Sequence, residues 1–139
     1  MKITLNYLEE MHFIASARHF SNIHIDEPDS FQGTDLAPSP IEYFLIGTGS
    51  CIGSTFTYCL QKNNISIKSL KLVVDGTLKH IGSNRRLKLV KIEVEILVAL
   101  KEGVSLEKFD LCCKTFQIYC PISDVITQRI PLSVNITRK

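Results

Sequence analysis

Hydrophobic and polar residues alternate near the start of the chain, which is the two-residue period of a β-strand. The alternation runs from Ile3 to Tyr7 and, less regularly, from Met11 to Ala15, with Glu9-Glu10 as the predicted turn between the two strands. Residues 22–26 form a shorter third strand. Residues 26–38 contain prolines, a glycine and three aspartates, so we expect an ordered loop there.

The segment Ser39-Pro40-Ile41-Glu42 predicts the start of a long helix. It combines an N-cap serine, a proline at the first helical position and a glutamate three residues after the cap, so that the serine and the glutamate satisfy each other's backbone N–H groups. We expect the helix to reach about Lys62. The stretch 41–60 carries one charge, Glu42, but it is rich in Gly, Ser and Thr. Because the rest of the chain reads as amphipathic strands, we interpret it as a buried central helix and not as a membrane span.

Two longer alternating segments, residues 65–80 and 87–100, predict an antiparallel hairpin with its turn at residues 81–86. One face of this hairpin is apolar and the other is charged, so we expect only the apolar face to pack against another element, the central helix. The second strand shows this division as Val90, Ile92, Val94 and Ile96 on one face and Leu89, Lys91, Glu93 and Glu95 on the other.

Ser105 is predicted to cap a second helix that runs to about Tyr119, and Cys120-Pro121 opens a third that runs to about Gln128. Residues 130–137 alternate again as a final strand. The order β-β-β-α-β-β-α-α-β predicts an α+β fold, with antiparallel sheets wrapped over a long buried helix. The apolar stripe of the second helix consists of Phe109, Cys112, Cys113 and Phe116.

The composition changes this picture little. A chain of 139 residues with 45% hydrophobic and 22% charged residues has enough apolar side chains for one ordinary globular domain, so we expect a single domain over residues 1–139. A net charge of +2 argues against nucleic acid as a partner. No secretory leader is visible, and five cysteines without a CxxC pair do not resemble a secreted disulfide framework, so we expect a cytoplasmic protein.

Two of the five cysteines stand in settings that suggest thiol redox chemistry. Cys51 lies in the central helix between small residues, Gly49-Ser50-Cys51-Ile52-Gly53, so we expect that another molecule can approach its sulfur closely. Cys120 lies at the start of the third helix, where the helix dipole favours a thiolate. The alternative for Cys51 is a small residue chosen for close helix packing. The remaining three are expected to fill core space as small hydrophobic residues and not to bind zinc: Cys59, Cys112 and Cys113.

A set of motifs in this order and spacing resembles the OsmC/Ohr family, the osmotically inducible protein C and organic hydroperoxide resistance proteins. The resemblance covers nearly the whole chain and rests on Asp26-Glu27-Pro28, Gly33-Thr34-Asp35, Pro38-Ser39-Pro40-Ile41-Glu42, Gly49-Ser50-Cys51 and Cys120-Pro121-Ile122-Ser123.

The resemblance implies an intertwined homodimer without a bound cofactor, in which organic hydroperoxides bind in an apolar pocket at the dimer interface. It implies that Cys51 attacks the peroxide and becomes a sulfenic acid. Cys120 then condenses with it to a disulfide, and an external dithiol reductant reopens that disulfide. The expected function is therefore thiol-dependent reduction of organic hydroperoxides in defence against oxidative stress.

One departure from the family pattern leaves a second function open. Ile41 stands where the family has a glutamate ten residues before the attacking cysteine, and Glu42 lies on the opposite helix face from Cys51. Arg18 is the nearest candidate for the family's arginine, but its spacing does not match. The alternative is a non-catalytic dimeric module that binds a small apolar or acyl ligand in the same pocket.

Overall fold

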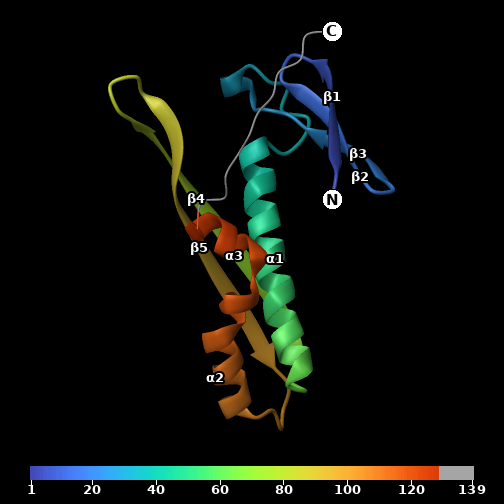
Figure 1. Cartoon of the computed structure of the whole chain (residues 1–139), viewed down its shortest axis with the longest axis vertical. Helices are drawn as coiled ribbons and strands as arrows, with labels where there is room; N and C mark the ends of the chain where they lie inside the picture. Colours follow the sequence, from blue (N-terminus) through green and yellow to red (C-terminus); the bar gives the residue numbers. More distant parts are fainter. Residues whose placement is uncertain (129–139) are drawn as a thin grey trace. The chain divides into compact units, whose positions relative to one another are not determined.

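The computed structural model describes residues 1–128 and divides the chain into two compact units, Met1–Gly47 and the part that begins at Thr48. The first unit contains strands β1 (Ile3–Glu9), β2 (His12–Ala17) and β3 (Phe20–Ile25), a 3₁₀ turn (Asp29–Phe31) and the first residues of helix α1 (Pro40–Lys62). The second contains the rest of α1, strands β4 (Ile67–Ile81) and β5 (Arg86–Leu100), helix α2 (Leu106–Thr115), a 3₁₀ segment (Phe116–Tyr119) and helix α3 (Pro121–Gln128), as Figure 1 shows.

This element order confirms the predicted α+β class with antiparallel sheets. The predicted final strand, residues 130–137, lies outside the described residues. None of the helices in residues 1–128 is long and apolar enough to cross a membrane.

In the first unit, β1, β2 and β3 form an antiparallel sheet in that order. The predicted turn at Glu9-Glu10 was one residue too early, because Glu9 still pairs with His12 and the chain reverses at Glu10 and Met11. Glu10 has a positive φ of 47°, a conformation that two-residue turns require. The prediction that Met11 belongs to the second strand was therefore wrong.

The start of α1 confirms the predicted capping box. The backbone N–H of Ser39 donates to Glu42 Oε2 at 2.7 Å, and the backbone N–H of Glu42 donates to Ser39 Oγ at 3.3 Å. The backbone N–H of Ser39 and, to a smaller extent, its side chain lower the pKa of the Glu42 carboxyl. Asn64, just past the end of the helix, takes a left-handed φ of 56° and stops it where the sequence predicted.

The loop before α1 is organised around the buried carboxylate of Asp26. Its oxygens accept hydrogen bonds from the backbone N–H groups of Glu27 at 2.8 Å, Thr34 at 3.1 Å and Leu36 at 3.2 Å, and from the Thr34 hydroxyl. Chiefly because of the Thr34 hydroxyl, the pKa of Asp26 falls to about 2. These hydrogen bonds hold the loop in one conformation around the carboxylate, which confirms the predicted ordered loop.

The second unit consists of the β4–β5 hairpin packed against three helical segments. The hairpin pairs Ile67 with Leu100 at one end and Ile81 with Arg86 at the other. Between Leu89 and Lys91 the register shifts, so that β5 has one more residue than β4 at this point. The predicted alternation was wrong here: Leu89 is half-buried and Val90 exposed, because a one-residue shift turns a side chain to the other face.

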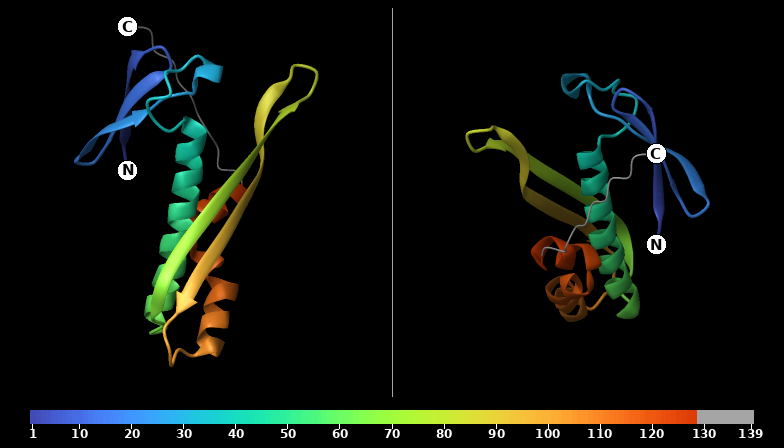
Figure 2. Two further views of the ribbon diagram at one scale, coloured as in Figure 1. Left: turned by 180° about the vertical axis from the view of Figure 1, so that it is seen from behind. Right: turned by 45° about the horizontal axis from the view of Figure 1, so that its top comes forward.

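The core of the second unit lies where α1, α2 and the hairpin run side by side (Figure 2). Phe56 of α1 meets Phe116 edge to face, with ring centroids 5.0 Å apart. Half-buried hairpin residues close one side of this cluster, which confirms that the apolar face of the hairpin covers the central helix. They are Ile67, Leu70, Ile96, Val98 and Leu100.

Farther toward its N-terminus, α1 approaches strand β4 through two glycines. A Cβ atom added at Gly49 would lie 2.5 Å from Val74 Cγ2, and one added at Gly53 would lie 3.2 Å from Leu72 Cδ1. Both distances are shorter than ordinary carbon contacts. The small residues of α1 therefore serve close packing of helix on strand.

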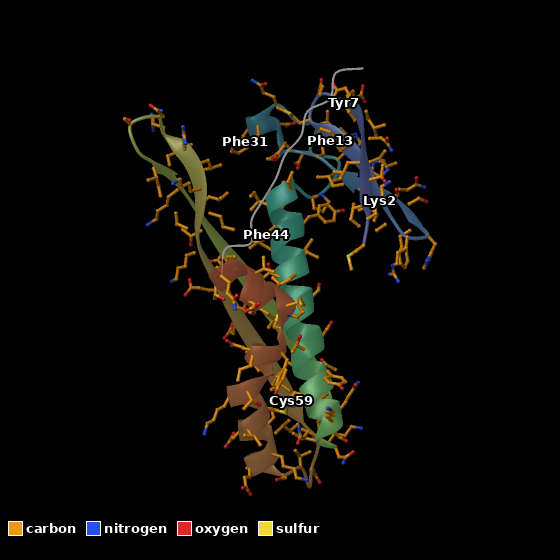
Figure 3. All side chains as sticks on the ribbon, in the orientation of Figure 1. Lys2, Tyr7, Phe13, Phe31, Phe44 and Cys59 are labelled. Carbon is orange, nitrogen blue, oxygen red and sulfur yellow. A yellow bond between two sulfur atoms is a disulfide. The ribbon has the colours of Figure 1, made fainter. Side chains whose placement is uncertain are left out.

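The prediction for three of the cysteines needs correction. Cys59 of α1 and Cys112 of α2 form a disulfide, with their Cα atoms 5.8 Å apart, so they are not separate core fillers. Figure 3 shows Cys59 between the two helices. Cys113 is exposed, because it follows Cys112 on the helix and points away from the core.

Replacing Gly49 by alanine is expected to destabilise the protein by about 1–3 kcal/mol, because the new methyl group must displace Val74 or the strand that carries it. Gly47→Ala is the matched control in the same helix, since a Cβ there meets nothing within 4 Å. Alanine's higher helix propensity predicts that this control gains about 0.5–1 kcal/mol. Urea denaturation measures both, and equal effects at the two glycines would contradict the packing described.

Stability is expected to fall in acid partly through Asp26. Its pKa is about 2 in the folded chain against an ordinary 3.8, so the carboxylate stabilises the fold above the ordinary value and this contribution disappears as the pH falls toward 2. Asp26→Asn should be less stable than wild type at neutral pH and should lose less stability on acidification. Thermal unfolding across this pH range measures it, with Asp29→Asn, an exposed change in the same loop, as control. An unchanged acid profile in Asp26→Asn would contradict the role assigned to this carboxylate.

Candidate functional site

The structure brings together the two cysteines that the sequence singles out. Cys51 on α1 and Cys120 before α3 are 69 residues apart, yet their Sγ atoms lie 3.5 Å from each other. Cys51 is half-buried and Cys120 is 1% exposed. A disulfide has an S–S distance of about 2.05 Å, so these sulfurs need to approach by only about 1.5 Å to bond. Neither is bonded in this structure.

Cys120 is placed by the junction between the 3₁₀ segment and α3. The following proline disfavours helical backbone at this residue, and Cys120 is extended, with φ −86° and ψ 109°. Its carbonyl accepts from the backbone N–H of Asp124 at 3.2 Å, which makes Cys120 the N-cap of α3. The side chain of an N-cap residue lies beside the free N–H groups of the first helical turn.

Those N–H groups and Ser123 lower the pKa of the Cys120 thiol. Burial works in the opposite direction, but hydrogen bonds from the Ser123 hydroxyl, the Ser123 backbone, the Cys51 thiol and the Ile122 backbone outweigh it. Ser123 was not singled out from the sequence as a functional residue. Ser123 lies three residues after the N-cap, the position from which a side chain can reach back to the cap residue. This spacing could have identified Ser123 from the sequence.

Cys51 has the opposite shift. Burial raises the pKa of the Cys51 thiol, the backbone N–H of Ile122 partly offsets this, and the neighbouring Cys120 raises it further. The thiolate of the pair is therefore favoured at Cys120. The start of α3 provides backbone N–H groups beside both sulfurs, and the Thr55 side chain also lowers the pKa of Cys51.

The sequence suggested that the small residues around Cys51 open space at its sulfur, and this prediction is wrong. Gly49 and Gly53 each lie two positions from Cys51, which is about 200° around the helix. They face β4, while Cys51 faces the Cys120 segment on the other side of α1. Close packing of the helix is therefore the role of the two glycines, whereas the Cys51 sulfur contacts the sulfur of Cys120.

A cavity of about 570 Å³ lies along α1, and neither Cys51 nor Cys120 lines it. Thr55, one turn after Cys51, lines it, and the Thr55 hydroxyl donates to the Cys51 carbonyl at 2.8 Å. The cavity continues along the helix toward Lys62, and Phe116 and Tyr119 line its other side. Three aromatic side chains therefore line the cavity together with Ser, Thr and Asn side chains, and a cation lies near one end.

The two charged residues considered from the sequence have other contacts. Glu42 is engaged in the capping box at the start of α1. The Arg18 guanidinium lies over the Phe20 ring, 5.1 Å from its centroid, within the first unit. Among residues 1–128, no three His, Cys, Asp or Glu side chains gather in a way that could hold a metal ion.

Comparisons with known proteins agree on one family. The family model described as OsmC-like protein matches residues 33–135. An OsmC-like protein from Mycoplasma pneumoniae is 19% identical, with 92% of this chain and 87% of that chain covered and a TM-score of 0.76. The organic hydroperoxide resistance protein OhrB of Bacillus subtilis is 19% identical, with 92% and 90% covered and a TM-score of 0.61.

A third solved structure, an organic hydroperoxide resistance protein OsmC from Legionella pneumophila, is 16% identical, with 90% of this chain and 87% of that chain covered and a TM-score of 0.62. At these identities the likeness establishes the fold. A comparison with curated protein sequences found no match.

Removing the Ser123 hydroxyl is expected to raise the pKa of Cys120. A hydrogen bond to a charged group contributes about 1.5–3 kcal/mol, so Ser123→Ala should move the first ionisation of the cysteine pair to a clearly higher pH. Thiolate absorbance in the ultraviolet, followed against pH, measures the shift. Thr127→Ala is the control, because that hydroxyl bonds only helix carbonyls, those of Ser123 and Asp124. An unchanged titration in Ser123→Ala would mean that the hydroxyl does not stabilise the thiolate.

Proposed function

The chain belongs to the OsmC-like protein family, and on that basis we propose that it is a thiol-dependent peroxidase that reduces organic hydroperoxides through Cys51 and Cys120. The single observation that carries the proposal is the 3.5 Å separation of the two sulfurs. Two proteins of the same fold are named for organic hydroperoxide resistance, which agrees with this choice of substrate.

In the first step Cys51 reacts as a thiolate. Cys51 is the more accessible sulfur of the pair, so peroxide meets it before Cys120. Its proton passes to the Cys120 thiolate across the contact between the sulfurs. The Cys51 sulfur then attacks the terminal peroxide oxygen, the O–O bond breaks, and the alkoxide leaves and takes up a proton. Cys51 becomes a sulfenic acid.

In the second step Cys120 resolves the sulfenic acid. Its lowered pKa favours the thiolate, which is the nucleophile in disulfide formation. The Cys120 thiol gives up the proton it took from Cys51, and its sulfur attacks the Cys51 sulfur. The S–O bond breaks, and the oxygen takes up a proton and leaves as water. A dithiol reductant then reopens the disulfide by two thiol exchanges and returns both cysteines to the reduced form.

The order of the pKa values fits these roles. A resolving cysteine acts after Cys51 has been oxidised. Cys51 is then no longer a thiol, and the N–H groups at the start of α3 stabilise only the Cys120 thiolate. The resting thiolate on Cys120 also provides an acceptor for the Cys51 proton. This account needs no glutamate at position 41, where the chain has Ile41.

As part of the same proposal, the protein works as a homodimer in the cytoplasm, in defence against oxidative stress and without a bound cofactor. Apolar side chains along β1 support the dimer, because Ile3, Leu5 and Tyr7 are all exposed in the single chain. Exposed apolar side chains in a row are typical of protein interfaces.

The activity test uses cumene hydroperoxide with a dithiol reductant and compares three single variants. Cys51→Ser should lose at least about a thousandfold in turnover, since no thiolate remains to attack the peroxide. Cys120→Ser should react once but turn over slowly, because the sulfenic acid is not resolved. Cys113→Ser, an exposed cysteine outside the pair, should keep wild-type turnover. Full turnover in Cys51→Ser would refute the proposal.

The cavity that begins at Thr55, one helix turn after Cys51, favours a second candidate, a non-catalytic dimeric module that binds a small apolar or acyl ligand. Its volume of about 570 Å³ falls within the usual range for small-molecule sites, and three aromatic side chains line it. This candidate predicts that native mass spectrometry finds a stoichiometric ligand retained through purification, and that Cys51→Ser and wild type are equally inactive with hydroperoxides. Turnover by the wild type that requires Cys51 would exclude it.

A further inference from the structure

The second sulfur pair of the chain, Cys59 and Cys112, lies apart from the proposed peroxidase site. Cys59 is eight residues after Cys51, about 12 Å farther along the axis of α1, so direct exchange between the two pairs is out of reach without a large rearrangement. The pair joins α1 to α2 across 53 residues of sequence.

The two sulfurs of this disulfide differ in access. Cys112 is 0% exposed, whereas Cys59 is half-buried and belongs to the wall of the 570 Å³ cavity. A thiol that enters the cavity therefore reaches the Cys59 side of the bond. Thiol exchange requires the attacking sulfur to meet one disulfide sulfur while the other departs, so access decides which cysteine is attacked.

The leaving sulfur has the closer hydrogen-bond donor. The Asn63 Nδ2 atom lies 3.3 Å from Cys112 Sγ and 3.8 Å from Cys59 Sγ. The same nitrogen donates to the Cys59 carbonyl at 2.9 Å, which holds it there. An N–H donor stabilises a thiolate more than a disulfide sulfur, because the charge on the thiolate strengthens the bond. Asn63 thus favours departure of Cys112.

The cavity also has a cation at its rim. Lys62 lines it, and the Lys62 ammonium lies 5.5 Å from the centroid of the Tyr58 ring, another lining residue. A cation at this place attracts an incoming thiolate or a thiol that carries a carboxylate.

From these observations we propose that Cys59–Cys112 is a second redox site, opened by small anionic thiols that enter the cavity and attack Cys59. The incoming thiolate bonds to Cys59 Sγ, the bond between Cys59 and Cys112 breaks, and its electron pair remains on Cys112 as a thiolate. A second thiol then attacks the sulfur of the first, forms the small disulfide and releases Cys59. Two thiols thus supply the two electrons, and the same small disulfide closes the bond again in the reverse reaction.

The reduced form keeps its packing under this proposal. Phe116 and Phe109 still meet Phe56, with ring centroids 5.0 and 6.3 Å away, so α2 stays attached to α1 without the covalent bond. Opening and closing therefore take place within the folded chain.

The test uses the full chain with Cys51, Cys113 and Cys120 all replaced by serine, so that its result is independent of the proposed peroxidase. In this background, Cys112→Ser treated with the disulfide of mercaptoethanol should carry the small thiol on Cys59 within minutes, while Cys59→Ser should leave Cys112 unmodified. Peptide mapping by mass spectrometry reads both. Mapping of the wild-type chain after brief thiol treatment and alkylation repeats the assignment if the serine variants do not fold.

Two rate comparisons complete the test. Mercaptopropionate should open the disulfide about threefold to fivefold faster than cysteamine at equal thiolate concentration, and Lys62→Gln should remove this preference. Asn63→Ala should slow opening by roughly tenfold, with Gln61→Ala as the control on the same helix turn. Modification of Cys112 in place of Cys59, or opening no faster than global unfolding, would overturn the proposal.

Discussion

Two glycines allow α1 to approach strand β4 so closely that one added carbon at Gly49 would lie 2.5 Å from Val74 Cγ2. This contact sets the rotation of α1 about its own axis. With Gly49 and Gly53 against the strand, the opposite side of the helix faces the 3₁₀ segment and α3, and Cys51 is on that side. The meeting of Cys51 with Cys120 thus depends on a packing contact that contains no sulfur.

Each of two sulfur pairs has one cysteine on α1, and the surroundings of the two pairs differ. At Cys51 and Cys120, the start of a helix and Ser123 stabilise a thiolate, and the sulfurs are close without being bonded. At Cys59 and Cys112, the sulfurs are bonded within the core, and only Cys59 borders a cavity. The first pair suits reaction with an oxidant, and the second suits exchange with a thiol. Cys59 lines the cavity between Thr55 and Lys62, and Cys51 lies one helix turn before Thr55.

Local rules of sequence were sufficient for most of the secondary structure. The capping box at Ser39, the left-handed Asn64 and the Cys120-Pro121 start all act within a few residues, so their effects follow from the residues themselves. The resemblance to a known family also singled out the two cysteines that the structure brings together.

What the sequence did not reveal depends on contacts over long distances or on small shifts of register. The bulge that exposes Val90 adds one residue to a strand whose alternation continues on either side. The Cys59–Cys112 bond joins two apolar stripes, and nothing in either stripe distinguishes a bonded cysteine from a packed one. Cys51 was assigned space from its glycine neighbours, although helix geometry places those glycines on the other face.

The central claim is that Cys51 and Cys120 form one redox pair, and peptide mapping after treatment with one equivalent of an organic hydroperoxide tests it most directly. The account predicts a disulfide between the peptides that contain Cys51 and Cys120, with the loss of two hydrogen atoms and with Cys113 unchanged. A Cys51 sulfinic acid without that disulfide, or two intact thiols after the peroxide has been consumed, would contradict the account.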